Sequence, residues 1–159
     1  MQPINWDAVD EQVAQGWIKK RKHPDADLYI YNYSQKAQHS WHWTPETRVC
    51  RGLITDGERN IVARPFQKFF SYEQLEGRLP EGPYRVYEKQ DGWLGIMYWA
   101  NGQPAIATRG SFETEAAKWA TDYFRRTVQV SGWRPPEHLT LLFEIVHPMT
   151  RIVVDYQGA

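Results

Sequence analysis

Lys89 is the residue whose surroundings most clearly suggest covalent chemistry, because it stands in residues 87–95 (YEKQDGWLG). A lysine amine attacks an electrophile only in its neutral form, which burial and neighbouring cations favour by lowering the pKa of the amine. Asp91 and Gly92 predict a turn in which the missing side chain lets a ligand approach closely. The pattern Lys-x-Asp-Gly is short, and an ordinary β-turn carrying a solvated lysine is the alternative interpretation.

Glu144 is a second candidate, because it is an acidic residue inside the apolar segment 142–146 (LFEIV). A carboxylate in such a segment is costly to bury unless it has a partner. The two-residue period of a strand puts Glu144 on the same face as Leu142 and Val146. We therefore expect this face to border a pocket.

Two cations stand upstream, Arg51 and Lys68. Taken alone, Arg51 could pair with Asp56 or Glu58 at the surface of a hairpin, and Lys68 could extend its apolar stem along a core strand beside Phe69. Phe143, next to Glu144, could be a stacking platform for a ring, although an aromatic residue in such a strand is more often part of the core.

Two further groups of residues carry weaker signals. The basic run at residues 19–23 (KKRKH) is interpreted as the solvated end of a helix, with contact to phosphates as the alternative. His39, His42 and Cys50 lack the spacing of a recognised zinc site, so no zinc site is predicted there.

Hydrophobic periodicity predicts the elements that position these residues. Helices are expected over residues 6–20 and 112–127, strands over 28–33, 139–146 and 152–156, and hairpins over 53–63 and 93–108, with turns at Asp56-Gly57 and Asn101-Gly102. Because helices and antiparallel hairpins mix without β-α-β alternation, the predicted class is α+β with an antiparallel β-sheet core and flanking helices.

Four more segments accompany the lysine segment along the chain. They are residues 50–53 (CRGL), 64–70 (RPFQKFF), 108–112 (TRGSF) and 142–153 (LFEIVHPMTRIV). In this order the set resembles the phage RNA ligase 1 family, a branch of the covalent nucleotidyltransferases. The resemblance begins near residues 31–33 (YNY) and covers most of the chain, and residues 68–70 and 143–153 are its most specific parts.

The resemblance implies an ATP-dependent RNA ligase with ATP and Mg²⁺ as its cofactors. In that family a lysine, here Lys89, becomes linked to AMP, which then passes to a 5′-phosphorylated RNA end before a 3′-hydroxyl end seals the strand. Arg51 and Lys68 match residues near the ATP phosphates. Glu144 matches an acid near the ribose or the metal ion, and Phe143 would pack beside the nucleotide. Glu88, Asp91 and Gly92 complete the implied nucleotide-binding set.

The family pattern extends beyond this chain, with a later acidic motif and a lysine-containing motif expected after Tyr156. Residues 1–159 are therefore interpreted as the N-terminal part of a nucleotidyltransferase domain of the ATP-grasp-like ligase type. Alone, this part is not expected to seal RNA. Its open strand edge would favour self-association or pairing with the missing C-terminal segment. The alternative function is a truncated, non-catalytic module that binds a nucleotide or an RNA end.

Composition sets the outer bounds of these interpretations. The chain has 159 residues with 42% hydrophobic content, which suits one folded domain. Its 19 basic and 19 acidic residues balance, which argues against a protein that coats nucleic acid, since such proteins are usually basic. No apolar run is long enough to cross a bilayer, and a single cysteine, Cys50, excludes an internal disulfide. A cytoplasmic protein is expected.

Overall fold

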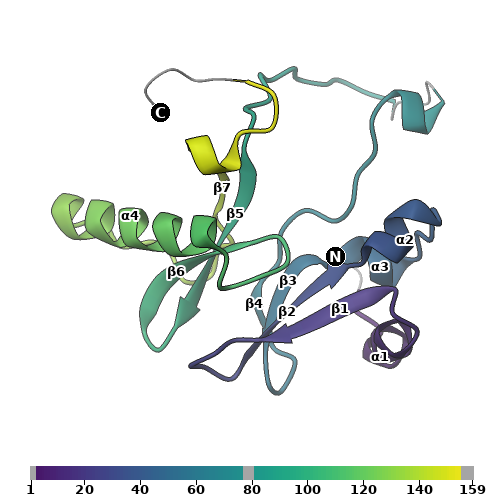
Figure 1. Cartoon of the computed structure of the whole chain (residues 1–159), viewed down its shortest axis with the longest axis horizontal. Coiled ribbons are helices and arrows are strands. Elements are labelled where there is room, and N and C mark those ends of the chain that lie inside the picture. Colours follow the sequence, from purple (N-terminus) through teal and green to yellow (C-terminus); the bar gives the residue numbers. More distant parts are fainter. Residues whose placement is uncertain (1–2, 77–80, 155–159) are drawn as a thin grey trace.

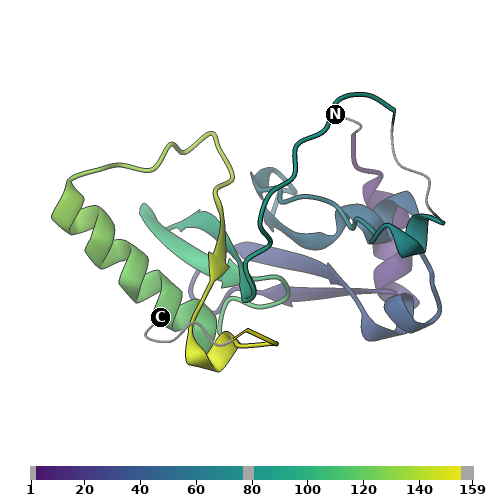
Figure 2. The ribbon, with the colours of Figure 1, turned by 90° about the horizontal axis from the view of Figure 1, so that it is seen from above.

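The computed structural model describes residues 3–76 and 81–154, which form two antiparallel sheets with a helix on the outer face of each (Figures 1 and 2). Sheet A has the strand order β1-β2-β3-β4, and sheet B has the order β6-β5-β7. The predicted α+β class with antiparallel sheets is confirmed. The elements are α1 (Trp6–Ala14), β1 (Ile18–Lys22), β2 (Leu28–Tyr33), α2 (Gln35–His39), α3 (Pro45–Val49), β3 (Arg51–Asp56), β4 (Ile61–Ala63), η1 (Glu73–Leu75), β5 (Trp93–Ala100), β6 (Gln103–Thr108), α4 (Glu115–Ser131), β7 (Leu142–Ile145) and η2 (Pro148–Thr150).

Alternation along the strands of sheet A separates two hydrophobic cores. In the antiparallel pairing of β2 with β3, Ile30 lies opposite Ile54 and Tyr31 lies opposite Leu53. Because neighbouring residues of a strand point to opposite faces, the two isoleucines enter the core shared with sheet B. Tyr31 and Leu53 enter the core beneath α1, where they meet Val9.

Sheet B follows the same rule. Ile96 and Tyr98 of β5 belong to the core between the sheets. Met97, which lies between them in the strand, packs with Ile106 and with Ala120 of α4. The layers are therefore α1, sheet A, sheet B and α4, and the inner faces of both sheets bury a common core.

The first predicted helix is wrong in its second half. Asn5 caps α1 by accepting a hydrogen bond from the backbone N–H of Ala8, and the helix ends at Ala14. Gly16 then takes a positive φ of 77°, which turns the chain back. The basic run that was interpreted as the end of this helix forms β1 instead, because Ile18 is buried and residues 18–22 pair with β2.

The two predicted hairpins are present. The hairpin of β5 and β6 turns at Asn101 and Gly102, both with positive φ, as the sequence predicts. The hairpin of β3 and β4 has a different turn from the predicted one, because the positive φ falls on Arg59 rather than on Gly57. Asp56 stabilises this longer turn by accepting hydrogen bonds from the backbone N–H groups of Glu58 and Asn60.

The helix predicted over residues 112–127 begins and ends about three residues later. Thr114 caps it by accepting a hydrogen bond from the N–H of Ala117, and Gly132 ends it with a φ of 67°. Phe112 precedes the helix and is buried in the core between the sheets. None of the helices within residues 3–76 and 81–154 combines the length and apolarity that crossing a membrane requires.

The C-terminal strand predictions hold only in part. β7 covers Leu142–Ile145 of the predicted 139–146. Residues 152–154 do not form the predicted strand, and the remainder of that prediction, 155–156, lies outside the described residues. The reason is that three successive backbone N–H groups, those of residues 152–154, turn towards one carboxylate, whereas in a strand successive N–H groups point in opposite directions.

His23 links β1 to the core of sheet B and should make stability depend on pH. Its Nδ1 accepts a hydrogen bond from the backbone N–H of Asp25, so in the neutral ring Nε2 donates to the hydroxyl of Tyr98 at 3.1 Å. Its ring also meets the edge of Phe112. Burial lowers the pKa of His23, although Asp25 and Glu113 oppose the shift.

Because the folded pKa of His23 lies below its ordinary value, the unfolded chain binds the extra proton more readily, and acid favours unfolding. We expect the stability contributed by His23 to be present above pH 6.5 and lost as the pH falls below it. Urea unfolding of the wild type and of His23→Gln at pH 5, 6, 7 and 8 measures this contribution. The difference between their free energies of unfolding should change with pH in that window, and a constant difference would contradict the assignment.

Candidate functional site

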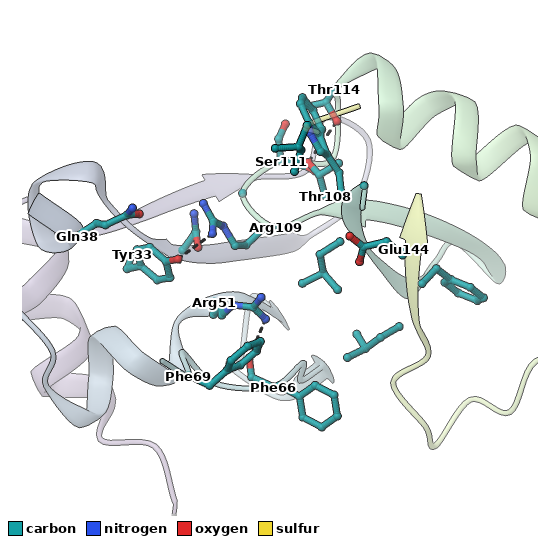
Figure 3. Close-up of a pocket in the computed structure, with 18 of the residues that line it drawn as sticks. Tyr33, Gln38, Arg51, Phe66, Phe69, Thr108, Arg109, Ser111, Thr114 and Glu144 are labelled. Carbon is teal, nitrogen blue, oxygen red and sulfur yellow. Dashed lines mark hydrogen bonds between the residues drawn. The ribbon is translucent and has the colours of Figure 1, made fainter. Parts of the chain in front are cut away.

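A cleft of about 1330 Å³ opens where the ends of the two sheets meet (Figure 3). Single small-molecule sites usually enclose about 300 to 1,000 Å³, so this space can hold a ligand together with part of a second molecule. Sheet A contributes residues of β1, β2 and β3, and sheet B contributes β7 and the turn after β6. The charged residues of its lining are the cations Lys19, Arg21, Arg51, Lys89 and Arg109 and the carboxylates Glu88 and Glu144.

Arg51 and Arg109 form a positive wall of the cleft. The Arg51 guanidinium donates to the backbone carbonyl of Phe66 at 3.3 Å and lies over the ring of Phe69. Arg109 donates to the hydroxyl of Tyr33 at 2.8 Å, and its guanidinium lies over the ring of Tyr33. Burial lowers the pKa of Arg51, and the nearby charge of Arg109 contributes to that lowering. A guanidinium remains protonated under such a shift, so this wall is suited to bind an anion.

Gly52 explains how the two arginines come close. It has a φ of 82°, and a Cβ atom there would lie 2.3 Å from Cδ1 of Ile96 and 3.3 Å from the backbone oxygen of Arg109. Only glycine therefore allows β3 to approach the end of β6 this closely. In the segment 50–53, Gly52 thus permits the close approach of the two strands, and Arg51 supplies the positive charge.

Lys68 does not line the cleft, although it was predicted to share the role of Arg51. Its ammonium donates to the backbone carbonyl of Phe69 at 2.6 Å and lies over the rings of Phe70 and Trp43. Desolvation lowers the pKa of Lys68, and the charges of Arg51 and Arg109 lower it further. Lys68 thus adds positive potential near the wall from a position among aromatic rings.

Lys89 and Glu88 lie on the cleft in an irregular segment that precedes β5. Both side chains are exposed. The ammonium of Lys89 lies 3.5 Å from the backbone carbonyl of Gln90. Of the two conditions that favour a neutral lysine amine, burial is thus not met in this structure, whereas cations do line the same cleft.

Asp91 does not line the cleft and instead fastens the C-terminal segment to the start of β5. Its Oδ2 accepts hydrogen bonds from the backbone N–H groups of Ile152, Val153 and Val154 at 3.2, 2.7 and 2.8 Å. These bonds to the ionised form lower the pKa of Asp91, the bond from Val153 most of all. The Asp91 carboxylate therefore lies outside the cleft, whereas its neighbours Gln90 and Gly92 line it.

Replacing Asp91 with alanine should release residues 152–154 without unfolding the sheets. The backbone N–H groups of these residues should then exchange with deuterated solvent faster, as mass spectrometry of the peptide that contains them would show. Asp122→Ala, an exposed change on α4, is the matched control and should leave that exchange unchanged. Since the pKa of Asp91 is lowered, the wild-type protection should be present above pH 3.8 and lost only in stronger acid. Equal exchange in Asp91→Ala and the wild type would exclude the fastening role.

Gly92 is buried because β7 passes directly over it. A Cβ atom at this position would lie 2.4 Å from the backbone oxygen of Ile145 and 3.2 Å from Cγ of Glu144. The missing side chain was predicted to admit a ligand. In the structure it admits β7, which brings Glu144 beside the segment that carries Lys89.

Glu144 and Phe143 point to opposite faces of β7. Glu144 pairs with Leu94 of β5, is exposed, and faces the cleft opposite the positive wall (Figure 3). Its charge raises the pKa of Arg51, against the larger effect of burial. Phe143 packs on Phe124 of α4 with ring centroids 5.3 Å apart, so its ring belongs mainly to the core and only part of the residue reaches the cleft.

The sequence interpretation assigned no role to Asn32 or to Arg109, although both stand in segments quoted for the family resemblance. Both line the cleft. The Oδ1 atom of Asn32 is buried and has no hydrogen-bond partner in the described part of the chain. Such an atom usually finds a donor in the protein, in water or in a ligand. The positive charge of Arg109 and the polar amide of Asn32 were the features of these segments from which a role in the site could have been predicted.

The donor groups in the cleft do not form a metal centre built from protein alone. Among the residues that the structure describes, no three His, Cys, Asp or Glu side chains gather closely enough to hold a metal ion. The cleft lining holds two carboxylates, Glu88 and Glu144, which are too few for such a centre. A divalent cation here would therefore need oxygen ligands from a second molecule.

Comparison with known proteins identifies the family. The sequence pattern of the RNA ligase family matches residues 49–158, which include both arginines of the positive wall. The chain is 28% identical over 123 residues to a protein of Autographa californica nuclear polyhedrosis virus named as a bifunctional polynucleotide kinase/RNA ligase. It is 26% identical over 195 residues to an RNA ligase of Rhodothermus phage RM378. The matches cover 70% and 94% of this chain but only 17% and 42% of the relatives. The resemblance inferred from the motifs is confirmed, and the chain belongs to the RNA ligase family.

Proposed function

We propose that this chain carries the adenylating site of an ATP-dependent RNA ligase, built on a nucleotidyltransferase fold. The observation that carries the proposal is the cleft itself, because it brings Lys89, the positive wall of Arg51 and Arg109, and the carboxylate of Glu144 to one place. A nucleophile, cations for phosphates and an acid for a metal ion are the groups that transfer of a nucleotidyl group from ATP requires.

In the first step, the neutral amine of Lys89 attacks the α-phosphorus of ATP. An N–P bond forms, the bond between the α-phosphorus and the bridging oxygen breaks, and pyrophosphate leaves with that electron pair. The nitrogen loses a proton to solvent and carries AMP as a phosphoramidate. Arg51 and Arg109 line the cleft, and we assign them to the negative charge that develops on the leaving group, because positive groups placed there in advance lower the barrier.

In the later steps, an oxygen of a 5′-phosphorylated RNA end attacks the phosphorus of the bound AMP. The N–P bond breaks as the nitrogen takes up a proton from solvent, which restores the amine of Lys89, and a phosphoanhydride joins AMP to the RNA. The 3′-hydroxyl of a second RNA end then attacks the 5′-phosphate of the RNA, loses its proton to solvent and displaces AMP. The size of the cleft suits a nucleotide and an RNA end together.

Mg²⁺ fits the donors present in the cleft. This ion is commonly held by one or two carboxylates and by phosphate oxygens of the substrate, rather than by a cage of protein ligands. Glu144 supplies one such carboxylate and faces the cleft. When bound, Mg²⁺ would neutralise phosphate charge during the transfer. Glu144 is the residue that would hold it.

Intact-mass spectrometry tests the proposal. The purified chain is incubated with ATP and Mg²⁺, and the mass should increase by one AMP. The same incubation with the non-hydrolysable analogue in which carbon replaces the oxygen between the α- and β-phosphates should give no adduct, because the bond that must break is not available. A chain that binds ATP without ever gaining AMP would contradict the proposed chemistry.

A further inference from the structure

The edge strand β1 presents two different faces. Ile18 is buried beneath α1, whereas residues 19–22 are exposed. Lys20 turns to the same side as Ile18, where its ammonium lies 4.4 Å from the centre of the Tyr29 ring. Lys19 and Arg21 turn to the other side and line the cleft. The two-residue period of a strand thus divides one basic run into a pair that faces the cleft and a pair that faces away.

Strand pairing places Lys19 in a row with the residues of the positive wall. Lys19 lies opposite Asn32 of β2, and Asn32 lies opposite Arg51 of β3. Directly opposed residues share a face of the sheet, so the three side chains follow one another across it. All three line the cleft. Arg21 continues the positive face along β1, away from Arg51.

These cations form no ion pair within the described part of the chain. No carboxylate of residues 3–76 and 81–154 lies within 4 Å of the charged group of Lys19, Arg21, Arg51 or Arg109. Glu88 and Glu144 line the same cleft at greater distance. The whole chain has no net charge, so the positive face is a local concentration and does not reflect a generally basic protein. Such a face attracts a polyanion.

We propose that β1 binds the sugar–phosphate backbone of the RNA strand whose end enters the cleft, with Lys19 and Arg21 each contacting a phosphate. The proposal rests on the proposed function, because it takes RNA as the substrate. It adds a binding surface outside residues 49–158, the part that matches the RNA ligase family pattern. In this arrangement Arg51 and Lys89 act on the reacting end, while Lys19 and Arg21 hold the strand that leads to it.

The alternating faces of β1 supply a matched control. The variant Lys19→Gln/Arg21→Gln removes two charges from the face on the cleft, and Lys20→Gln/Lys22→Gln removes two from the opposite face of the same strand. Both lower the net charge equally, and glutamine retains much of each side chain's length. Binding is measured by fluorescence anisotropy with a 5′-phosphorylated single-stranded RNA oligonucleotide, labelled at its 3′ end, over a series of salt concentrations. Thermal unfolding verifies that both variants are folded.

The variant on the cleft face should bind the RNA on the order of tenfold more weakly at low salt, and the slope of log affinity against log salt should fall by about 1.4, which is 0.7 for each lost phosphate contact. The control variant should retain most of the affinity and nearly the full slope. Equal weakening by both variants, no weakening by either, or a wild type that does not bind the oligonucleotide would overturn the proposal.

Formation of the AMP adduct separates this inference from the proposed function. The control variant should form the adduct with ATP at nearly the wild-type rate, and the cleft-face variant should lose far less in adduct formation than in RNA binding, because β1 is assigned to the RNA and not to the triphosphate. Loss of adduct in the cleft-face variant would assign Lys19 and Arg21 to ATP and overturn the inference while leaving the proposed function intact. If the wild type never formed the adduct but still bound RNA through the cleft face of β1, the proposed chemistry would be refuted and the RNA-binding surface would stand.

Discussion

Replacing Lys89 with arginine is expected to abolish the AMP adduct completely, although the variant should fold as the wild type does. The guanidinium remains protonated and offers no free electron pair for attack on phosphorus. Lys89 is exposed on an irregular segment, so the larger head group meets no packed neighbours that would disturb the sheets. Intact mass after incubation with ATP and Mg²⁺, together with a thermal unfolding curve, provides the measurement.

Lys118→Arg is the matched control for this experiment. Lys118 is exposed on α4 and does not line the cleft, so this variant should form the adduct as fully as the wild type. Proteolysis of the wild-type adduct should place the added mass on the peptide that contains Lys89. Persistent labelling of Lys89→Arg would assign the nucleophile to another residue.

Replacing Arg51 with alanine should slow the formation of the adduct strongly. Loss of one preorganised group that stabilises developing charge typically raises a barrier by about 2 to 4 kcal/mol, which is a slowing of roughly 30-fold to 1000-fold. Lys68→Ala should have a much smaller effect, because Lys68 lies among aromatic rings outside the lining of the cleft. The sequence alone predicts equal roles for these two cations, and the structure separates them.

The position of Arg51 also predicts which step is affected. Its charge would act on the triphosphate, so Arg51→Ala should slow adduct formation from ATP more than transfer of AMP to Lys89 from RNA that already carries AMP at its 5′ end. Rapid-quench measurements of both steps with the wild type, Arg51→Ala and Lys68→Ala make the comparison. Equal slowing of both steps by Arg51→Ala would indicate a general structural role. If Arg51→Ala and Lys68→Ala slowed adduct formation equally, the position of Arg51 in the lining of the cleft would not explain its effect on the rate.

Local sequence signals predicted those parts of the fold whose geometry is set by near neighbours. Asn101 and Gly102 adopt positive φ readily, and the alternation of β2 depends on residues of that strand alone. The predictions failed where a partner outside the segment decides its structure. Residues 18–22 form a strand because they pair with β2, which follows after a short turn. Residues 152–154 form no strand because their N–H groups donate to the carboxylate of Asp91, more than 60 residues away in the sequence.

The sequence likewise predicted some features of the candidate site and not others. The family resemblance implied one site for Arg51, Lys89 and Glu144, and all three line one cleft. It could not distinguish Gly92 as a neighbour of β7 from Gly92 as a neighbour of a ligand, because both require only that a side chain be missing. Residues 19–23 were assigned to a helix, and a helix would not divide their charges between two faces as a strand does.

The basic edge of β1 has a further consequence for the state of the protein in solution. An edge strand presents unpaired backbone groups to which a strand of another molecule can add, and lysines along such an edge oppose this addition. A second copy aligned along β1 would bring its own row of cations, residues 19–22, close to the first. Repulsion between the rows therefore protects this edge from aggregation. Because salt screens exposed charges over about 10 Å at 0.1 M, the protection weakens as ionic strength rises.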